Sequence, residues 1–311
     1  MKTVKAVAPY SHGINFKMQV YDAWVKTGGQ TMKGHYPWRM FHRFAFNYEL
    51  PTIHKSDKVA QLRFVEPVSI NLDTFPDYAR YEIIPFVWDC WPGYFDKTCE
   101  WFKRHEVRTA IFTSSQTSER MRQRFPDMNI LTITEGININ LYDKGEELKE
   151  RIIKVYEIGS VQRGYFKKKY SKEYASLYNA PTDWDLATTE GFKKHLENTK
   201  LTVIFPKSIT EPDTAQGIET LTQRYWECML SRIVMVGHAP KELTDLLGYN
   251  PVIELNRNSE LAHINHILDE IDEPKYQNLV DKNRNSALQY ASWNIRMSHI
   301  LTWLKEVGYN V

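Results

Sequence analysis

The chain has 311 residues, enough for two domains of ordinary size, and its 42% hydrophobic and 25% charged content is that of a globular protein. The net charge of +2 is too small for the basic footprint of a typical duplex-binding protein. Residues 1–50 nevertheless carry seven Lys or Arg against two Asp or Glu, which allows an anionic acceptor or a membrane surface as partner.

The cysteines and the apolar runs bear on the location of the protein. Cys90, Cys99 and Cys228 have neither metal-binding nor disulfide-framework spacing, which indicates a reducing compartment. Residues 1–10 lack the apolar segment of a signal peptide, and no apolar run approaches the roughly twenty residues of a membrane span. We therefore expect a cytoplasmic protein, with peripheral contact at the inner face of the membrane as an open alternative.

The first predicted elements are a strand, a turn and a helix. Residues 4–8 form the strand, residues 9–13 form a loop that contains His12 and Gly13, and residues 16–26 form the helix. A single glycine is not a dinucleotide-binding fingerprint. The loop is therefore either an ordinary turn or part of a binding cleft.

Residues 32–48 are at once basic and aromatic. One interpretation is a partly buried helix or loop in which arginine stems pack on aromatic rings. The other is a surface for an anionic or lipid-linked acceptor.

Asp89 follows a buried strand that we predict at residues 80–87. The carboxyl ends of strands are where α/β proteins place binding groups, so Asp89 is a candidate site residue. Alternatively it caps the helix predicted at residues 94–103. A strand at 109–113, a helix capped by Ser114 and Ser115, and a strand at 130–133 then form a βαβ unit.

A second series of α/β elements follows a charged stretch at residues 140–151, in which we place a domain boundary. We predict strands at 152–158, 201–205, 233–236 and 252–255. We predict helices at 166–178, within 182–196, and at 222–231, 240–247, 259–270, 273–290 and 295–307. The alternation predicts an α/β fold with two Rossmann-like domains.

Glu219 and Glu227 lie on either side of the start of the helix predicted at 222–231. Residues 220–223 fit a capping box, which would place a helix N-terminus, a favourable site for phosphate, directly after Glu219. Paired carboxylate oxygens suit the vicinal hydroxyls of a sugar or a ribose. Glutamates are also common near helix starts because the helix dipole favours them there, so the spacing alone leaves both interpretations open.

The pattern Glu219-x7-Glu227, followed by Cys228 and the strand at 233–236, resembles the retaining nucleotide-sugar glycosyltransferases of the GT-B architecture (the E-x7-E group). Residues 222–227 look like the branch found in bacterial surface-polysaccharide synthesis. Residues 135–138 resemble the turn that closes the N-terminal domain, 156–159 the strand that opens the donor domain, and 292–296 the terminal helix that crosses back. The resemblance extends from about residue 108 to the end of the chain.

This resemblance implies an acceptor-binding Rossmann-like domain at residues 1–146 that faces a nucleotide-sugar-binding Rossmann-like domain at 147–290 across a cleft. A terminal helix at 291–311 would pack back on the first domain. The residues with implied catalytic roles are Glu219, Arg163 and Lys207. The residues with implied donor or nucleotide contacts are Glu227, Thr220, Leu221, Thr222, Arg224 and Gly159, of which Arg224 could instead pair with an acidic neighbour. On the acceptor side we place Asp89, Gly13 and His12.

The implied activity is a hexosyl transfer, with retention, from a UDP- or GDP-sugar to a hydroxyl of a saccharide or lipid-linked saccharide, in polysaccharide or glycoconjugate synthesis. Glu219 would contact the donor sugar and Glu227 the ribose, while Arg163 and Lys207 would neutralise the leaving diphosphate. We expect no cofactor and no metal, because the nearest Asp-x-Asp pair, Asp183 and Asp185, reads as a turn.

The chain also departs from the family pattern. Thr220 and Thr222 stand where glycines are usual, and Arg232 stands where glycine is frequent. Two alternatives therefore stay open. One is a phage-type DNA-base glucosyltransferase with a nucleic-acid acceptor, which the modest charge disfavours. The other is a non-catalytic two-domain protein that binds a sugar or an anion.

Overall fold

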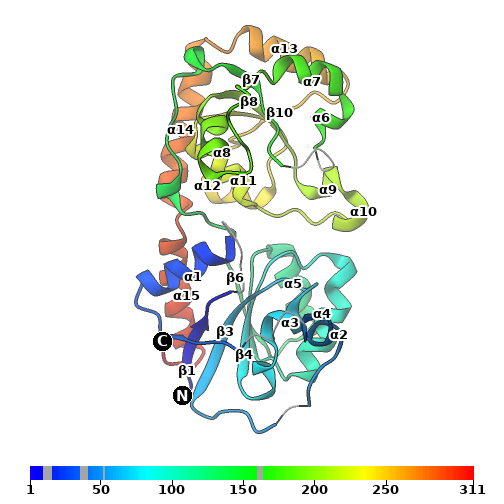
Figure 1. The fold of residues 1–311 in the computed structure, drawn as a ribbon, viewed down its shortest axis with the longest axis vertical. Helices are drawn as coiled ribbons and strands as arrows, with labels where there is room; N and C mark the ends of the chain where they lie inside the picture. The colour runs from blue at the N-terminus through cyan, green and yellow to red at the C-terminus, as the bar shows by residue number, and fades with distance from the viewer. Residues whose placement is uncertain (10–15, 36–40, 52, 160–163) are drawn as a thin grey trace. The chain divides into compact units, whose positions relative to one another are not determined.

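The computed structural model describes residues 1–9, 16–35, 41–51, 53–159 and 164–311. The chain forms two compact units (Figure 1). Unit 1 comprises Met1–Thr134 and Trp293–Val311, and unit 2 comprises Glu135–Ser292. The return of the last helix to unit 1 agrees with the predicted fold class.

Unit 1 is built on a parallel sheet of six strands in the order β2-β1-β3-β4-β5-β6. These are β1 (Thr3–Val7), β2 (Thr31–Met32), β3 (Val59–Val65), β4 (Glu82–Val87), β5 (Thr109–Phe112) and β6 (Asn129–Thr132). The strand order reverses at β1 and β3, as in doubly wound folds. Val65 lies opposite Val87, so β3 and β4 end together at one edge of the sheet.

Helices cover both faces of the unit 1 sheet (Figure 1). On one face lie α1 (Phe16–Lys26) and α15 (Trp293–Glu306), and on the other lie α4 (Pro92–Arg104) and α5 (Ser115–Arg124), with the shorter α2 (His42–Asn47), α3 (Ile70–Thr74) and η2 (Asp77–Ala79) in the connections. In α15 the buried Trp293, Met297, Ile300 and Leu304 recur every three or four residues, which directs one stripe of the helix into the core. The Ser114 side chain caps α5 as predicted, because it accepts a hydrogen bond from the Thr117 amide.

Unit 2 contains a parallel sheet of four strands in the order β10-β9-β8-β7. The strands are β7 (Ile153–Val155), β8 (Thr199–Ile204), β9 (Val234–Gly237) and β10 (Ile253–Glu254). The helices are α6 (Phe166–Lys169), α7 (Ser171–Leu177), α8 (Thr189–Glu197), α9 (Lys207–Thr210), α10 (Pro212–Ala215), α11 (Gln223–Leu230), α12 (Lys241–Leu247), α13 (Glu260–Asp269) and α14 (Pro274–Tyr290), with η3 (Ile139–Leu141) and η4 (Leu148–Glu150). Separate hydrophobic clusters pack on the two faces of this sheet as well. Two Rossmann-like α/β units are thus confirmed.

The division between the units lies at 134/135, earlier in the chain than the 146/147 suggested by the charged stretch. Two buried arginines tie that stretch to unit 2. Arg151 donates to the carbonyl oxygens of Lys144 and Glu146, each at 2.9 Å. Arg232 donates to the carbonyl oxygen of Lys144 at 3.0 Å. A charged sequence is here held by side chains of unit 2 and is not a free linker.

Candidate functional site

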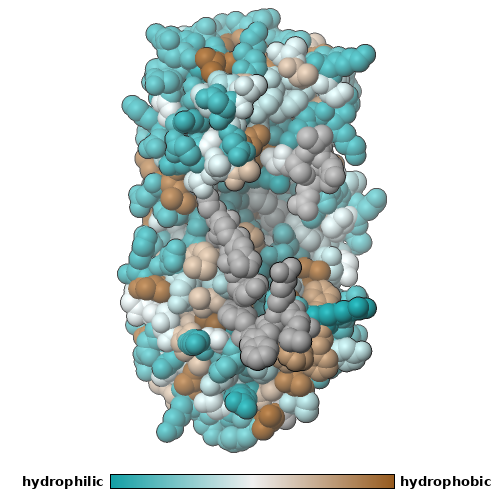
Figure 2. Space-filling model, viewed as in Figure 1, coloured by the Kyte–Doolittle hydropathy of each residue, from teal (hydrophilic) through white to brown (hydrophobic). Residues whose placement is uncertain are grey.

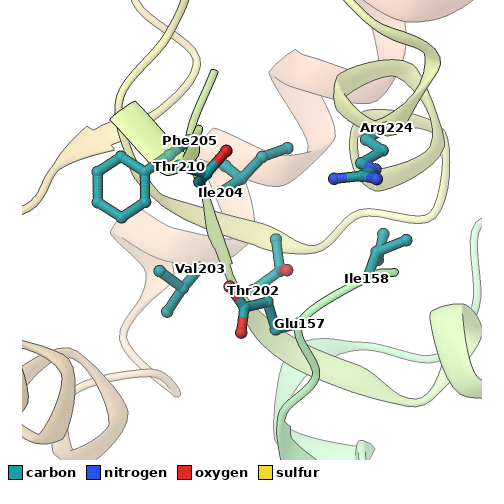
Figure 3. A pocket seen from close by; sticks show the side chains of 8 residues that line it. All are labelled: Glu157, Ile158, Thr202, Val203, Ile204, Phe205, Thr210 and Arg224. Atoms are coloured by element: carbon teal, nitrogen blue, oxygen red, sulfur yellow. The ribbon is translucent and has the colours of Figure 1, made fainter. Parts of the chain in front are cut away.

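A pocket opens at the carboxyl edge of the unit 2 sheet, where β7 and β8 end (Figure 3). Its lining residues are Glu157, Ile158, Thr202, Val203, Ile204, Phe205, Thr210 and Arg224. Figure 3 shows Arg224 and Phe205 on opposite sides of this pocket. The site therefore occupies the position that parallel α/β sheets use for ligands.

Glu157 is a buried carboxylate in this pocket. Its oxygens accept hydrogen bonds from the amides of Tyr165, Phe166 and Lys167, at 2.6, 3.1 and 2.8 Å. Burial raises the pKa of Glu157, and the three amides together with the Lys167 charge oppose that rise. The carboxylate thus holds the first residues of α6 at the end of β7.

Arg224 lies over Gly159 at the mouth of the pocket. The glycine has a φ of +107°, and a Cβ atom there would lie 3.2 Å from Nη2 of Arg224. A glycine at this position both permits the left-handed backbone and leaves room for the guanidinium. The side chain of Arg224 itself is exposed.

A second cation stands close to Arg224. Lys167 is 7% exposed, and its ammonium donates to the carbonyl oxygens of Glu157, at 3.1 Å, and Gly159. Burial lowers the pKa of Lys167; the Glu157 charge opposes this, and the positive charge of Arg224 adds to it. Glu157 balances one of these two positive charges, so the exposed Arg224 supplies the net positive charge that favours an anion as ligand.

Glu219 belongs to a neighbouring polar group at the ends of β8 and β9. Its Oε1 accepts a hydrogen bond from Ser208 at 3.1 Å and lies 3.6 Å from Nε2 of His238. The other ring nitrogen of His238 lies 3.1 Å from Glu254. His238 was not predicted, although it is the first polar residue after the apolar strand β9, a position that would have identified it.

Glu227 lies in a third environment. Its Oε1 accepts a hydrogen bond from the hydroxyl of the buried Tyr142 at 3.0 Å. Burial raises the pKa of Glu227, and the Tyr142 bond and the Arg224 charge oppose that rise. Tyr142 lies 85 residues away in the chain, so no local pattern could have identified it.

The predicted capping box at residues 220–223 is wrong. Helix α11 begins at Gln223, and its N-cap residue Thr222 makes no side-chain capping bond. The Gln223 amide instead donates to Glu135 at 3.0 Å, and the Leu221 amide donates to Glu242 at 2.8 Å. Carboxylates from elsewhere in unit 2 accept hydrogen bonds from these two amides, and residues 220–222 lie outside the helix.

The other candidate residues are dispersed. Lys207 begins α9 and pairs with Glu211 at 3.4 Å. Asp89, in unit 1, is exposed just beyond β4 with a left-handed φ of +50°. It does not cap α4, whose N-cap is Trp91. His12, Gly13 and Arg163 lie outside the described residues. Thr220 is half-buried and precedes α11.

The pair Asp183 and Asp185 lies in a turn, as predicted. The Asp185 side chain accepts from the Ala187 amide at 2.8 Å. Among residues 1–9, 16–35, 41–51, 53–159 and 164–311, no three His, Cys, Asp or Glu side chains are grouped so as to hold a metal ion. None of the helices within those ranges is long and apolar enough to span a bilayer.

Replacing Glu227 with glutamine is expected to stabilise the unliganded protein near neutral pH by on the order of 1 kcal/mol. Because burial makes the pKa of Glu227 higher in the native than in the unfolded state, the native state binds more protons than the unfolded state at pH values above about 4.5. The free energy of unfolding therefore falls through that window in the wild type but not in the variant. The side-chain oxygen of glutamine can still accept a hydrogen bond from the Tyr142 hydroxyl.

Urea unfolding at about pH 4 and about pH 7 would measure the difference. The stability gap between Glu227→Gln and wild type should be near zero at the lower pH and open at the higher one. Glu190→Gln, whose side chain is 75% exposed on α8, is the matched control. An equal gap at both pH values would contradict the prediction.

Comparisons with known proteins identify related folds. No family model matches the chain, and no curated protein matches it. Among solved structures, Anabaena HepE in complex with UDP and glucose is similar with a TM-score of 0.57 at 10% identity, over 97% of this chain and 100% of that chain. A sucrose-phosphate synthase from Thermosynechococcus elongatus is similar with a TM-score of 0.60 at 10% identity, over 99% of each chain.

A glycosyltransferase from Rickettsia africae is also similar, with a TM-score of 0.52 at 8% identity over 99% of each chain. At these identities the likeness concerns the fold. The chain therefore has the α/β fold that these solved structures share.

Proposed function

We propose that the protein is a glycosyltransferase that uses a nucleotide-diphosphate sugar. The observation that carries the proposal is the pocket at the carboxyl edge of the unit 2 sheet, where the exposed Arg224 stands over Gly159 beside the buried Lys167. Such a paired positive charge suits a diphosphate. The fold likeness to HepE, which was crystallised with UDP and with UDP-glucose, supports the same ligand class.

The donor would bind with its diphosphate beside the exposed guanidinium of Arg224, which lies over Gly159. Glu219 would then accept hydrogen bonds from the sugar hydroxyls, and Glu227 from the ribose hydroxyls, since each carboxylate offers two acceptor oxygens. Lys207 would supply further positive charge after release from Glu211. Arg163 keeps the role that the family resemblance gave it.

We further propose transfer with retention and without a metal. The bond between the anomeric carbon and the diphosphate oxygen breaks, and the acceptor hydroxyl oxygen bonds to that carbon from the same face. The hydroxyl proton passes to the departing phosphate oxygen. Arg224 and Lys207 would neutralise the charge that develops on the diphosphate, so their contribution is electrostatic.

The acceptor class is a hydroxyl of a saccharide or lipid-linked saccharide, in polysaccharide or glycoconjugate synthesis. We propose that unit 1 binds it, with Asp89 as a contact. The left-handed backbone of Asp89 is an uncommon conformation for a residue other than glycine, and such residues cluster at binding sites.

A thermal-shift screen with UDP-, GDP- and CMP-sugars tests the proposal. A ligand at 100 times its Kd stabilises the native state by about 2.7 kcal/mol and should raise Tm measurably. The donor that binds should then release free nucleotide by slow hydrolysis, and Glu219→Ala should abolish the release. The proposal would be refuted if no nucleotide sugar bound at millimolar concentration and Glu219→Ala did not change the release of free nucleotide.

Two other outcomes would redirect it. A ligand that raises Tm but is never turned over would indicate a non-catalytic binding protein. Salt-dependent binding of duplex DNA would indicate a nucleic-acid acceptor.

A further inference from the structure

Unit 1 exposes a group of aromatic side chains around α2. Among the residues that the structure describes, five Phe or Tyr side chains are exposed, and four of them are Phe41, Phe44, Phe46 and Tyr48, at 49, 44, 46 and 61%. Figure 2 shows apolar residues gathered at the position of α2. We call these four residues the α2 aromatic patch.

The exposure of the patch follows from how α2 is anchored. Ala45 is fully buried beneath the helix. The Asn71 side chain donates to the carbonyl oxygens of Ala45 and Tyr48, at 2.8 and 2.9 Å. With 100° between successive helical residues, this anchoring leaves Phe44 and Phe46 on the two flanks and turns Arg43 outward. The patch is therefore a fixed surface feature of unit 1.

The charge around the patch is one-sided. Residues 31–48 include Lys33, Arg39 and Arg43 but no Asp or Glu. The first acid after them, Glu49, is already paired with Arg104 at 2.5 Å and with His105 at 2.8 Å. In contrast, residues 151–311 contain twenty Lys or Arg and twenty Asp or Glu. The local excess is thus complementary to an anionic surface.

We propose that the α2 aromatic patch docks unit 1 on an anionic phospholipid bilayer. Aromatic rings with an adjacent cation are suited to the membrane interface, where the rings enter the headgroup region and the guanidinium meets lipid phosphate. Phe44 and Tyr48 are stacked with ring centroids 5.1 Å apart, so they present their surface together. The binding does not depend on the proposed transferase activity, and it requires no membrane-spanning helix.

Co-sedimentation of the full-length protein with vesicles tests this proposal. Binding should be stronger to phosphatidylcholine vesicles that contain phosphatidylglycerol than to phosphatidylcholine alone, and it should weaken with salt. Replacing both Phe44 and Phe46 by serine should lower the partition constant on the order of 20-fold. The reason is that about half of each ring is exposed and available to insert into the membrane, and serine removes this apolar area. Arg43→Ala should lower it about fivefold, and this loss should shrink at high salt.

Leu186 and Leu288 of unit 2, exposed at 44 and 40%, provide the matched control. Their replacement with serine should leave vesicle binding unchanged. Unchanged near-UV circular dichroism and Tm would verify that the Phe44 and Phe46 variant is folded. If the Phe44 and Phe46 variant is not folded, the Arg43→Glu variant, whose side chain faces outward, is the test instead. It is expected to lose binding to phosphatidylglycerol vesicles.

Three outcomes would overturn the proposal. The first is no binding of the wild type to phosphatidylglycerol vesicles at low salt. The second is equal binding by the folded patch variants. The third is a concentration-dependent dimer that the variants abolish while vesicle binding is absent, since the patch would then be a contact between two copies of the chain.

Discussion

Replacing Arg232 with alanine is expected to lower the free energy of unfolding by about 3 to 5 kcal/mol. Arg232 is 5% exposed and lies in the turn between α11 and β9. Its guanidinium makes ion pairs with Glu147 and Asp281, each at 2.9 Å. It also donates to three consecutive carbonyl oxygens, those of Lys144, Gly145 and Glu146. Alanine removes all five hydrogen bonds and leaves the carbonyl groups without this donor.

Arg232 also has a left-handed backbone, with φ at +54°. This explains the departure from the family pattern, in which glycine is frequent here: the position needs a positive φ, and this chain accepts the strain in exchange for the guanidinium contacts. Arg232→Gly should therefore be less destabilising than Arg232→Ala, by about 1 kcal/mol. Arg232→Lys keeps the charge but loses the planar fork and should fall between wild type and alanine.

Urea unfolding of the three variants at one pH measures these differences, with the m value as a check that the transition stays two-state. Lys241→Ala is a suitable control, because Lys241 is 80% exposed and pairs only across one helical turn with Asp245. A loss below about 1 kcal/mol for Arg232→Ala would show that water replaces the guanidinium without cost.

The sequence predicted most regular elements because their cores are apolar and periodic. The strands β4, β5 and β9 consist mainly of buried aliphatic and aromatic residues, and β8 ends with the buried Val203 and Ile204. The central strand β3 was not predicted, because it carries the polar residues Gln61 and Arg63 within a buried stretch. Gln61 and Arg63 are buried there, and both donate to Asp77, which lies beyond α3 in the chain. The burial of Gln61 and Arg63 could not be predicted from the local sequence, because their partner Asp77 is distant in the chain.

The part of the candidate site that lies at the end of a strand could be predicted from the sequence. Gly159 and Arg224 were both among the predicted donor contacts, and the structure brings them together at the pocket. The interactions of Glu227 with Tyr142 and of the Gln223 amide with Glu135 join residues 85 and 88 positions apart. The capping box assigned the Gln223 amide to the Thr220 side chain, but this amide donates to the Glu135 carboxylate, and the helix begins at Gln223.

Replacing Arg224 with alanine is expected to lower kcat/KM for the nucleotide-sugar donor by about 100- to 1,000-fold. Under the proposed function, the guanidinium contacts the diphosphate in the ground state and more strongly as negative charge builds up on the leaving group. Arg224→Lys should recover only part of the loss, because an ammonium is a point charge without the bidentate fork. The fold should be unaffected, since Arg224 is exposed on the first turn of α11.

Initial rates of donor turnover, with donor affinity measured separately by calorimetry, divide the loss between binding and the chemical step. Gly159→Ala provides an independent approach to the same contact, because its Cβ would meet Nη2 of Arg224 at 3.2 Å and its backbone would be strained at a φ of +107°. If both changes act through the guanidinium over Gly159, the double variant should lose little more activity than Arg224→Ala alone. Additive losses would mean that Gly159 and Arg224 act separately, and an unchanged donor affinity in Arg224→Ala would place the diphosphate elsewhere in unit 2.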